Sequence, residues 1–167
     1  MTNSQEAATT TSTSIHAHHG EAQPALVLVN LGTPTAPEPG PVRAFLREFL
    51  SDRRVIEMNP FLWKPILEGI ILRVRPREVS RKYRSIWLEQ GSPLMHYTRE
   101  QARLLGERLP GVRVEVAMRY GQLSIGAALD RLHAQGVRRV AVLPAYPHYS
   151  ATTVASINDA VCAWIGR

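Results

Sequence analysis

The sequence contains a single cysteine, Cys162, in a chain of 167 residues. One thiol excludes an intrachain disulfide framework. It also excludes zinc and iron–sulfur sites built only of thiolates, so no iron–sulfur cluster is expected. No run of about 18 uninterrupted apolar residues exists, and residues 61–72, which come nearest, are interrupted by charges and a proline. A membrane-spanning helix is therefore not expected. Lysine is also scarce, because only Lys64 and Lys82 of the 20 basic residues are lysines.

The overall composition is that of a globular domain. Hydrophobic residues make up 44% and charged residues 20%, which is enough apolar material for one domain with a sizeable core. The net charge of +6 comes almost entirely from arginine, whose planar fork binds carboxylates and phosphates. A base-composition bias of the genome would produce the same preference for arginine. The charge therefore allows an anionic partner without indicating nucleic acid in particular.

The amino-terminal segment differs in composition from the rest of the chain. Residues 9–14 contain only Thr and Ser, and no basic residue precedes Arg43, so the segment does not resemble a secretory signal. Its histidines have no carboxylate or cysteine at a ligand spacing. We therefore interpret residues 1–24 as a disordered leader and residues 25–167 as the folded domain.

Strand and helix patterns alternate along residues 25–167. An apolar run without alternation, residues 25–30, is typical of a strand buried on both faces. Further strands are predicted over 112–118 and 137–143, with short connections to neighbouring helices. This order predicts an α/β fold with a doubly wound parallel sheet and right-handed crossovers. The predicted helices cover residues 42–50, 60–72, 76–87, 98–109, 124–134 and 153–165.

Local signals set the ends of several predicted helices. Pro76 is expected to open one helix, on which Tyr83, Ile86 and Trp87 form the buried face. Thr98, with Gln101 three residues later, reads as a capping box, and Ser124 is a second N-cap. Gly136 is expected to end the helix that Ser124 begins.

The carboxyl ends of the three predicted strands are expected to form the functional site, because open parallel sheets bind ligands at that edge. The loops there cover residues 30–34, 118–121 and 146–150 and carry apolar, aromatic and hydroxyl side chains with one arginine. The first loop has a single glycine, which excludes a Rossmann or P-loop nucleotide site. A flat, partly apolar ligand that bears acid groups suits this edge better.

Four motifs, in order, resemble ferrochelatase in its Gram-negative bacterial form. They are Asn-Leu-Gly-Thr-Pro at 30–34, Phe-Leu-Ser-Asp-Arg-Arg-Val at 49–55, Gly-Ser-Pro-Leu at 91–94 and Leu-Pro-Ala-Tyr-Pro-His-Tyr-Ser at 143–150. The resemblance implies a cytoplasmic lyase that inserts Fe²⁺ into protoporphyrin IX to form protohaem, the last step of haem synthesis. It also implies two similar α/β domains, of which this chain covers the first.

The resemblance places the metal-handling His and Glu of the family in later stretches that residues 1–167 do not contain. No catalytic residue, no metal ligand and no cofactor is therefore expected in this chain, and the chain alone is not expected to insert iron. The positions that fall where the family binds porphyrin are Leu31, Arg75, Tyr83, Ser92, Arg119, Tyr120, Tyr146, His148, Tyr149 and Ser150. Arginines would pair with propionates, and aromatic and aliphatic side chains would cover the ring.

Other interpretations of these residues stay open. Arg75 could be a solvated charge, Tyr83 a core residue and Ser92 only a turn residue. The His148 imidazole could take a pyrrole proton or bind Fe²⁺, but because the essential His of the family lies elsewhere, we interpret His148 as a wall of the pocket. Arg119, beside Tyr120 at a strand end, is the leading candidate to pair with a porphyrin carboxylate.

Two other functions remain as alternatives. The first is a porphyrin-binding module without catalysis. The second is a nucleic-acid binder that uses the basic run at residues 73–84, although this run lacks interleaved surface aromatics. Residues 61–72 could make peripheral membrane contact, but a core helix is preferred. Self-association through an exposed cleft is also open.

Overall fold

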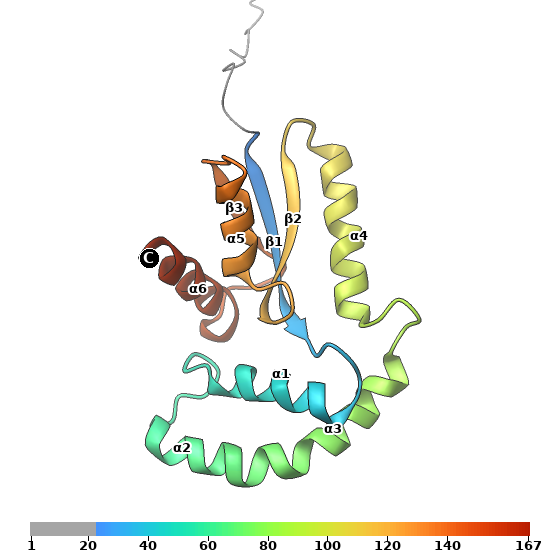
Figure 1. The fold of residues 1–167 in the computed structure, drawn as a ribbon, viewed down its shortest axis with the longest axis vertical. Helices are drawn as coiled ribbons and strands as arrows, with labels where there is room; N and C mark the ends of the chain where they lie inside the picture. Colours follow the sequence, from blue (N-terminus) through green and yellow to red (C-terminus); the bar gives the residue numbers. More distant parts are fainter. Residues whose placement is uncertain (1–22) are drawn as a thin grey trace, which may run out of the picture.

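The computed structural model describes residues 23–167, so the predicted leader lies outside the described residues apart from positions 23 and 24. Three strands form a parallel sheet in the order β2-β1-β3. They are β1 (Ala25–Thr33), β2 (Arg113–Gly121) and β3 (Val140–Pro144). All three strands end at the same edge of the sheet, which faces downward in Figure 1. The predicted parallel α/β fold is confirmed.

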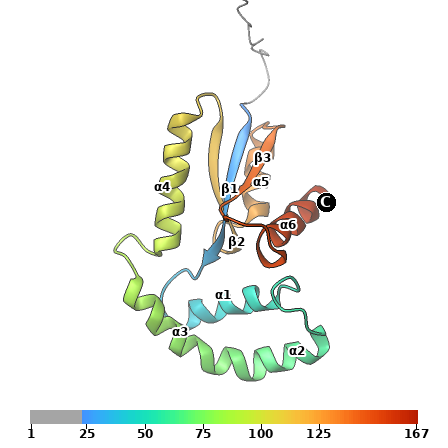
Figure 2. The same ribbon diagram turned by 180° about the vertical axis from the view of Figure 1, so that it is seen from behind.

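Helices cover both faces of the central strand β1. On one face Ala25, Val27 and Val29 pack in the main hydrophobic core with α5 (Ile125–Ala134) and α6 (Ser156–Ile165). On the other face Leu28 lies against α4 (Pro93–Arg108). Figure 2 shows α4 and the α5–α6 pair on opposite sides of the strands. Burial on both faces explains why the β1 sequence shows no alternation.

The remaining helices form a separate unit, which we call the helical arm (residues 39–86). It contains α1 (Pro39–Ser51), α2 (Pro60–Ile66), the π-helical segment η1 (Leu67–Ile71) and α3 (Leu72–Ile86). The arm folds back on itself through contacts between α1 and α3. In Figures 1 and 2 it lies across the carboxyl end of the sheet. The arm therefore stands at the edge where ligand binding is expected.

Some predicted helix ends are confirmed and others are wrong. The Ser124 hydroxyl accepts a hydrogen bond from the Ala127 N–H at the start of α5. Gly136, just beyond the end of α5, has a positive φ of 81°. Pro76, by contrast, lies buried inside α3 rather than at its start, because the helical path already begins at Pro60. Thr98 is also inside a helix, since α4 begins at Pro93 with Ser92 as its N-cap.

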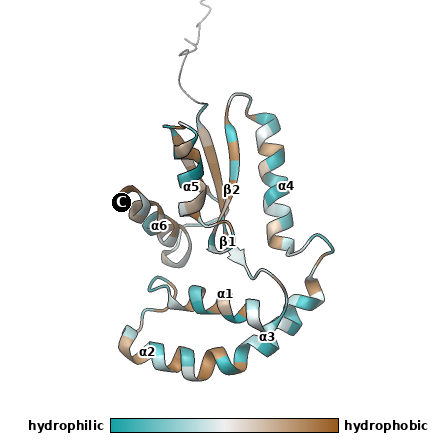
Figure 3. Cartoon of the chain, in the orientation of Figure 1, coloured by the Kyte–Doolittle hydropathy of each residue, from teal (hydrophilic) through white to brown (hydrophobic). Residues whose placement is uncertain are grey.

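The exposed surfaces of the arm correct two further predictions. Ile86 is 56% exposed rather than buried, while Tyr83 and Trp87 pack edge-to-face and are half-buried. Residues 60–72 are mostly exposed rather than a core helix, because Phe61 is 89% exposed and only Leu67 and Leu72 are buried. Figure 3 shows the hydrophobic colouring along α2. Among residues 23–167 no helix is long and apolar enough to cross a membrane.

Strand β3 is shorter than the predicted strand over 137–143, and it is partly exposed. It lies at an edge of the sheet and pairs only with β1. Val140 and Leu143 are 37% and 42% exposed. One face of β3 is covered, by α5 and α6 through Val142.

Candidate functional site

The ends of β1 and β2 approach each other unusually closely at the carboxyl edge of the sheet. Gly32 pairs with Tyr120, and Thr33 pairs with Gly121. A Cβ atom on Gly32 would lie 1.9 Å from the Tyr120 carbonyl oxygen, and Gly32 has a φ of +110°. This approach holds the loop after β1 beside the loop after β2. The end of β3 joins them, because the Ala145 N–H donates to the Val29 carbonyl.

Helix α1 rests on this edge through one of its faces. Phe45 is buried, and Phe49 packs edge-to-face on Tyr120 with the ring centroids 5.2 Å apart. The Glu48 carboxylate accepts a hydrogen bond of 2.7 Å from the Gly121 N–H. Asp52 follows directly after the last turn of α1 and continues this face, since residues spaced three or four apart lie on one side of a helix.

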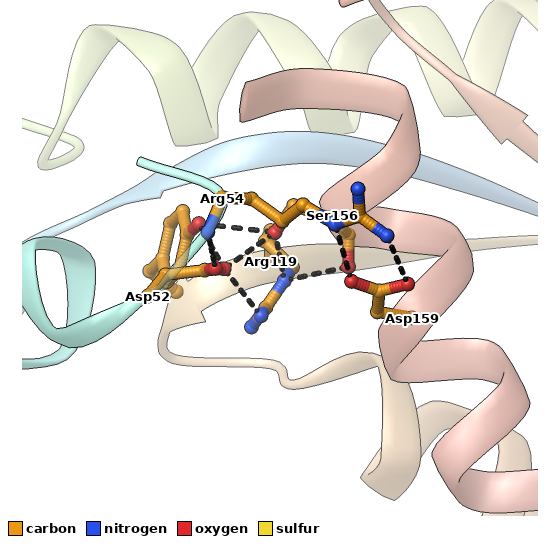
Figure 4. A network of polar contacts seen from close by, with 6 residues as sticks. Asp52, Arg54, Arg119, Ser156 and Asp159 are labelled. Atoms are coloured by element: carbon orange, nitrogen blue, oxygen red, sulfur yellow. Dashed lines mark hydrogen bonds and ion pairs between the residues drawn. The ribbon is translucent and has the colours of Figure 1, made fainter. Parts of the chain in front are cut away.

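Asp52 is the centre of a polar network that joins α1, β2 and α6 (Figure 4). Its Oδ2 atom accepts hydrogen bonds from Arg119 Nη2 at 2.7 Å, the Tyr120 hydroxyl at 2.7 Å and Ser156 Oγ at 2.6 Å. Its Oδ1 atom accepts from the Arg54 backbone N–H at 2.7 Å. The Asp52 side chain is only 9% exposed. Every carboxylate oxygen is thus satisfied, as a nearly buried charge requires.

The network sets the protonation of its members. Burial raises the pKa of the Asp52 carboxyl, but the hydrogen bonds from Ser156, Tyr120 and the Arg54 N–H, with the charge of Arg119, hold it below its usual value. Burial raises the pKa of Tyr120 to about 12. At neutral pH the Asp52 carboxyl is therefore ionised and the Tyr120 phenol is neutral.

A second, exposed contact lies beside the first. Arg54 makes a two-bond ion pair with Asp159 on α6, at 2.7 and 3.1 Å. Both side chains are about half exposed, so solvent screens the pair and it contributes little. The buried contact made by Asp52 is the stronger of the two links between the arm and α6.

The structure places Arg119 inside this network rather than free at the surface. Its Nε atom donates to the Ser156 carbonyl and hydroxyl at 3.0 and 2.7 Å, and its Nη2 donates to Asp52. Its guanidinium also stacks 4.6 Å from the centroid of the Tyr120 ring. A porphyrin carboxylate would have to compete with Asp52 for this side chain. The pairing of Arg119 with a propionate stays a prediction, and Tyr120, which is 1% exposed, belongs to the same network.

The loop after β3 places its predicted residues in different environments. Tyr146 packs against the main core, and its hydroxyl is buried without a partner among the described residues. Burial raises its pKa to about 12. The Ser150 hydroxyl bonds to Thr152 and Thr153, where the chain enters the segment η2 (Ala151–Ala155). His148 and Tyr149 are exposed.

The other predicted residues lie toward α3 and α4. Leu31 is half-buried near the end of β1, and Ser92 is buried at the start of α4. Asn30 joins these two segments, because its side-chain amide donates to the Thr98 hydroxyl at 3.0 Å. Tyr83 is half-buried near the end of α3, and burial raises its pKa.

Arg75 lines a cavity within the arm. The cavity has a volume of about 390 Å³ and lies between α1 on one side and α2, η1 and α3 on the other. Arg75 is 58% exposed at its side chain and pairs weakly with Glu78 at 3.6 Å. Apolar side chains form the rest of the lining, namely Leu46, Leu50, Trp63, Ile71 and Val79. The cavity therefore combines an apolar wall with one cation.

Sequence reasoning missed Asp52 and Ser156. Asp52 was noted only as a member of the motif at 49–55 and was given no role, although its spacing from Phe45 and Phe49 places it on the face of α1 that packs on the sheet. Ser156 had no comparable signal. Within residues 23–167 no cluster of three or more His, Cys, Asp or Glu side chains could hold a metal ion.

Comparisons with known proteins agree on one family. The ferrochelatase family model matches residues 23–167. The chain is 51% identical over 156 residues to ferrochelatase from Methylibium petroleiphilum, a match that covers 91% of this chain and 43% of that protein. It is 52% identical over 143 residues to ferrochelatase from Xylella fastidiosa, covering 86% of this chain and 45% of the relative. The chain thus spans less than half the length of these curated relatives.

Proposed function

The chain belongs to the ferrochelatase family, and we propose that it supplies the porphyrin-holding part of an enzyme that inserts Fe²⁺ into protoporphyrin IX in the cytoplasm. The resemblance assigns metal handling to a His and a Glu beyond residue 167. In this proposal residues 23–167 bind and orient the macrocycle, and Fe²⁺ is a substrate rather than a resident cofactor.

The cavity lined by Arg75 is the observation that carries the proposal. Protoporphyrin is a flat apolar ring with two carboxylates, and a pocket for it needs an apolar wall with cationic groups nearby. The cavity in the arm has both, and Arg75 occupies the position that the resemblance assigns to porphyrin binding. Tyr83 farther along α3, with Leu31 on β1 and Ser92 at the start of α4, would complete this side of the site.

Titration with protoporphyrin IX, followed by quenching of tryptophan fluorescence, tests the proposal. Arg75→Ala is expected to weaken binding by about tenfold, the lower end of the range for a charge-assisted hydrogen bond, since the side chain is 58% exposed. Arg99→Ala, which removes an exposed arginine from α4, is the matched control and should bind normally.

Two results would contradict the proposal. One is the absence of saturable porphyrin binding by the folded chain. The other is equal loss of affinity in both variants, which would show that net positive charge alone attracts the ligand. Binding of a single-stranded oligonucleotide with a steep salt dependence would instead favour the nucleic-acid alternative.

The exposed apolar side chains of the arm support a proposal of peripheral membrane contact. Phe61, Leu62 and Ile70 are 89%, 64% and 59% exposed. Two exposed cations lie nearby in the sequence, Lys64 between Leu62 and Ile70 and Arg73 three residues after Ile70. Apolar side chains flanked by cations suit the surface of an anionic bilayer. Self-association through the same residues is the competing use of this surface.

A further inference from the structure

We infer that Asp52 is the positioning residue that fixes the helical arm across the carboxyl edge of the sheet. Three of its four hydrogen-bond donors belong to the sheet and the helices packed on it: Arg119 and Tyr120 on β2, and Ser156 on α6 (Figure 4). Asp52 itself follows the last residue of α1. One carboxylate therefore links the arm to two elements of the body. The inference rests on the proposed function where it concerns porphyrin, because the arm carries the proposed cavity.

The other polar contacts described between the arm and the body are weaker than this link, and Phe45 adds apolar packing near Gly121. The Arg54–Asp159 pair is about half exposed on both sides, and Glu48 makes a single hydrogen bond to the Gly121 N–H. Phe49 contributes one edge-to-face contact with Tyr120. The Asp52 network is the one contact that combines charge, burial and several hydrogen bonds, which makes it costly to break.

The body of the domain has a core of its own. The buried cluster that joins β1, β2, α5 and α6 contains no residue of the arm. Loss of the Asp52 carboxylate should therefore release the arm while the sheet stays folded. A residue that merely stabilised the whole fold would affect all elements alike. A loss of protection that is confined to the arm would therefore separate a positioning role from a general structural one.

Amide hydrogen exchange of the 167-residue chain at neutral pH tests the inference. Asp52→Asn replaces one carboxylate oxygen, which only accepts hydrogen bonds, with an amide N–H₂, which only donates them. The new N–H₂ would face donors that are already directed at this position, so the network would lose hydrogen bonds as well as a charge. Exchange in α1 and α3 is expected to become at least about tenfold faster, while amides in β1 and α5 change by less than about twofold. Glu100→Gln, which removes an exposed ion pair on α4, is the control and should change neither region.

Ser156→Ala is a milder second variant, in case Asp52→Asn does not fold. It removes one donor from the network but keeps the ion pair between Asp52 and Arg119. The same regional pattern with a smaller increase in the arm is expected. A uniform increase across arm and body, or no change in either variant, would overturn the inference.

Protoporphyrin IX binding by the same variants provides an independent readout. If the arm carries the porphyrin cavity, Asp52→Asn should weaken binding by about tenfold or more, although Asp52 does not line the cavity. If the unmodified chain does not bind protoporphyrin at all, the proposed function fails, and the exchange pattern still decides the role of Asp52. If porphyrin binds equally well to a chain whose arm is released, the link between arm position and binding is wrong.

Discussion

Replacement of Gly32 with alanine is expected to destabilise the domain by about 4 kcal/mol or more, enough to unfold much of the population. The new Cβ would lie 1.9 Å from the Tyr120 carbonyl oxygen and 2.8 Å from its carbonyl carbon. These are backbone atoms of a paired strand, so they cannot move aside without breaking the pairing between β1 and β2. The φ of +110° adds strain that any side chain would suffer.

Gly106→Ala is the matched control for this prediction. Gly106 lies inside α4, where a new Cβ would be 3.9 Å from Val114 Cγ2, which is ordinary contact. Alanine there should stabilise the domain by about 0.5–1 kcal/mol, because it favours the helix. Urea unfolding followed by tryptophan fluorescence measures both changes. A stable Gly32→Ala variant with unchanged midpoint would mean that the ends of β1 and β2 do not approach as described.

Replacement of Arg119 with alanine is expected to cost about 3 kcal/mol of unfolding free energy, the low end of the range for removing one partner of a buried ion pair. The side chains of Arg119 and Asp52 are 21% and 9% exposed, so the remaining carboxylate would be left almost buried without a cation. The stacking of the guanidinium on Tyr120 would also be lost. Arg119→Lys should recover only part of this, because an ammonium cannot bond to Ser156 and Asp52 with one planar fork.

A double-mutant cycle checks the physical reason for this cost. The combination of Asp52→Asn with Arg119→Ala should cost clearly less than the sum of the two single changes, since neither charge is then left alone. Additive costs, or a cost below about 1 kcal/mol for Arg119→Ala, would mean that the network is loose in solution. In that case Arg119 would again be available for a ligand carboxylate.

The sequence predicted the parallel sheet well, because uninterrupted apolar runs and short connections are strong signals. Its failures have identifiable physical causes. A threonine hydroxyl can accept a hydrogen bond from a backbone N–H at the start of a helix, or donate one to a backbone carbonyl inside a helix. Inside α4 the Thr98 hydroxyl donates to the Leu94 carbonyl four residues earlier, so the same residue type does not prove a cap. The prediction that Pro76 begins a helix was wrong for a similar reason, because a helical path that begins at Pro60 accommodates this proline in its interior.

The convergence of the three loops on one edge was predictable from the sequence, but the contacts between their side chains were not. The three loops could be assigned to one edge from the rule for parallel sheets, but which side chains pair with one another depends on tertiary contacts. Arg119 illustrates the limit, because its main partner Asp52 lies 67 residues away in the sequence and on the arm. No local pattern links the two positions. The exposure of β3 was equally hidden, since an apolar run does not reveal whether a helix covers each face of a strand.

Anaerobic insertion of Fe²⁺ into protoporphyrin IX, followed by absorbance, tests the central claim most directly. The claim is that residues 1–167 hold the porphyrin and that the metal-handling groups lie elsewhere. General base catalysis contributes about 10²–10⁴-fold, and it needs a group within hydrogen-bond reach of the pyrrole protons. His148 is the only imidazole in the loop after β3, and it is exposed.

The chain is therefore expected to bind protoporphyrin without metallating it. Insertion should begin when the part of a full-length relative beyond the matched region is added. Clear turnover by residues 1–167 alone that disappears in His148→Ala would contradict this account and would make His148 a catalytic residue.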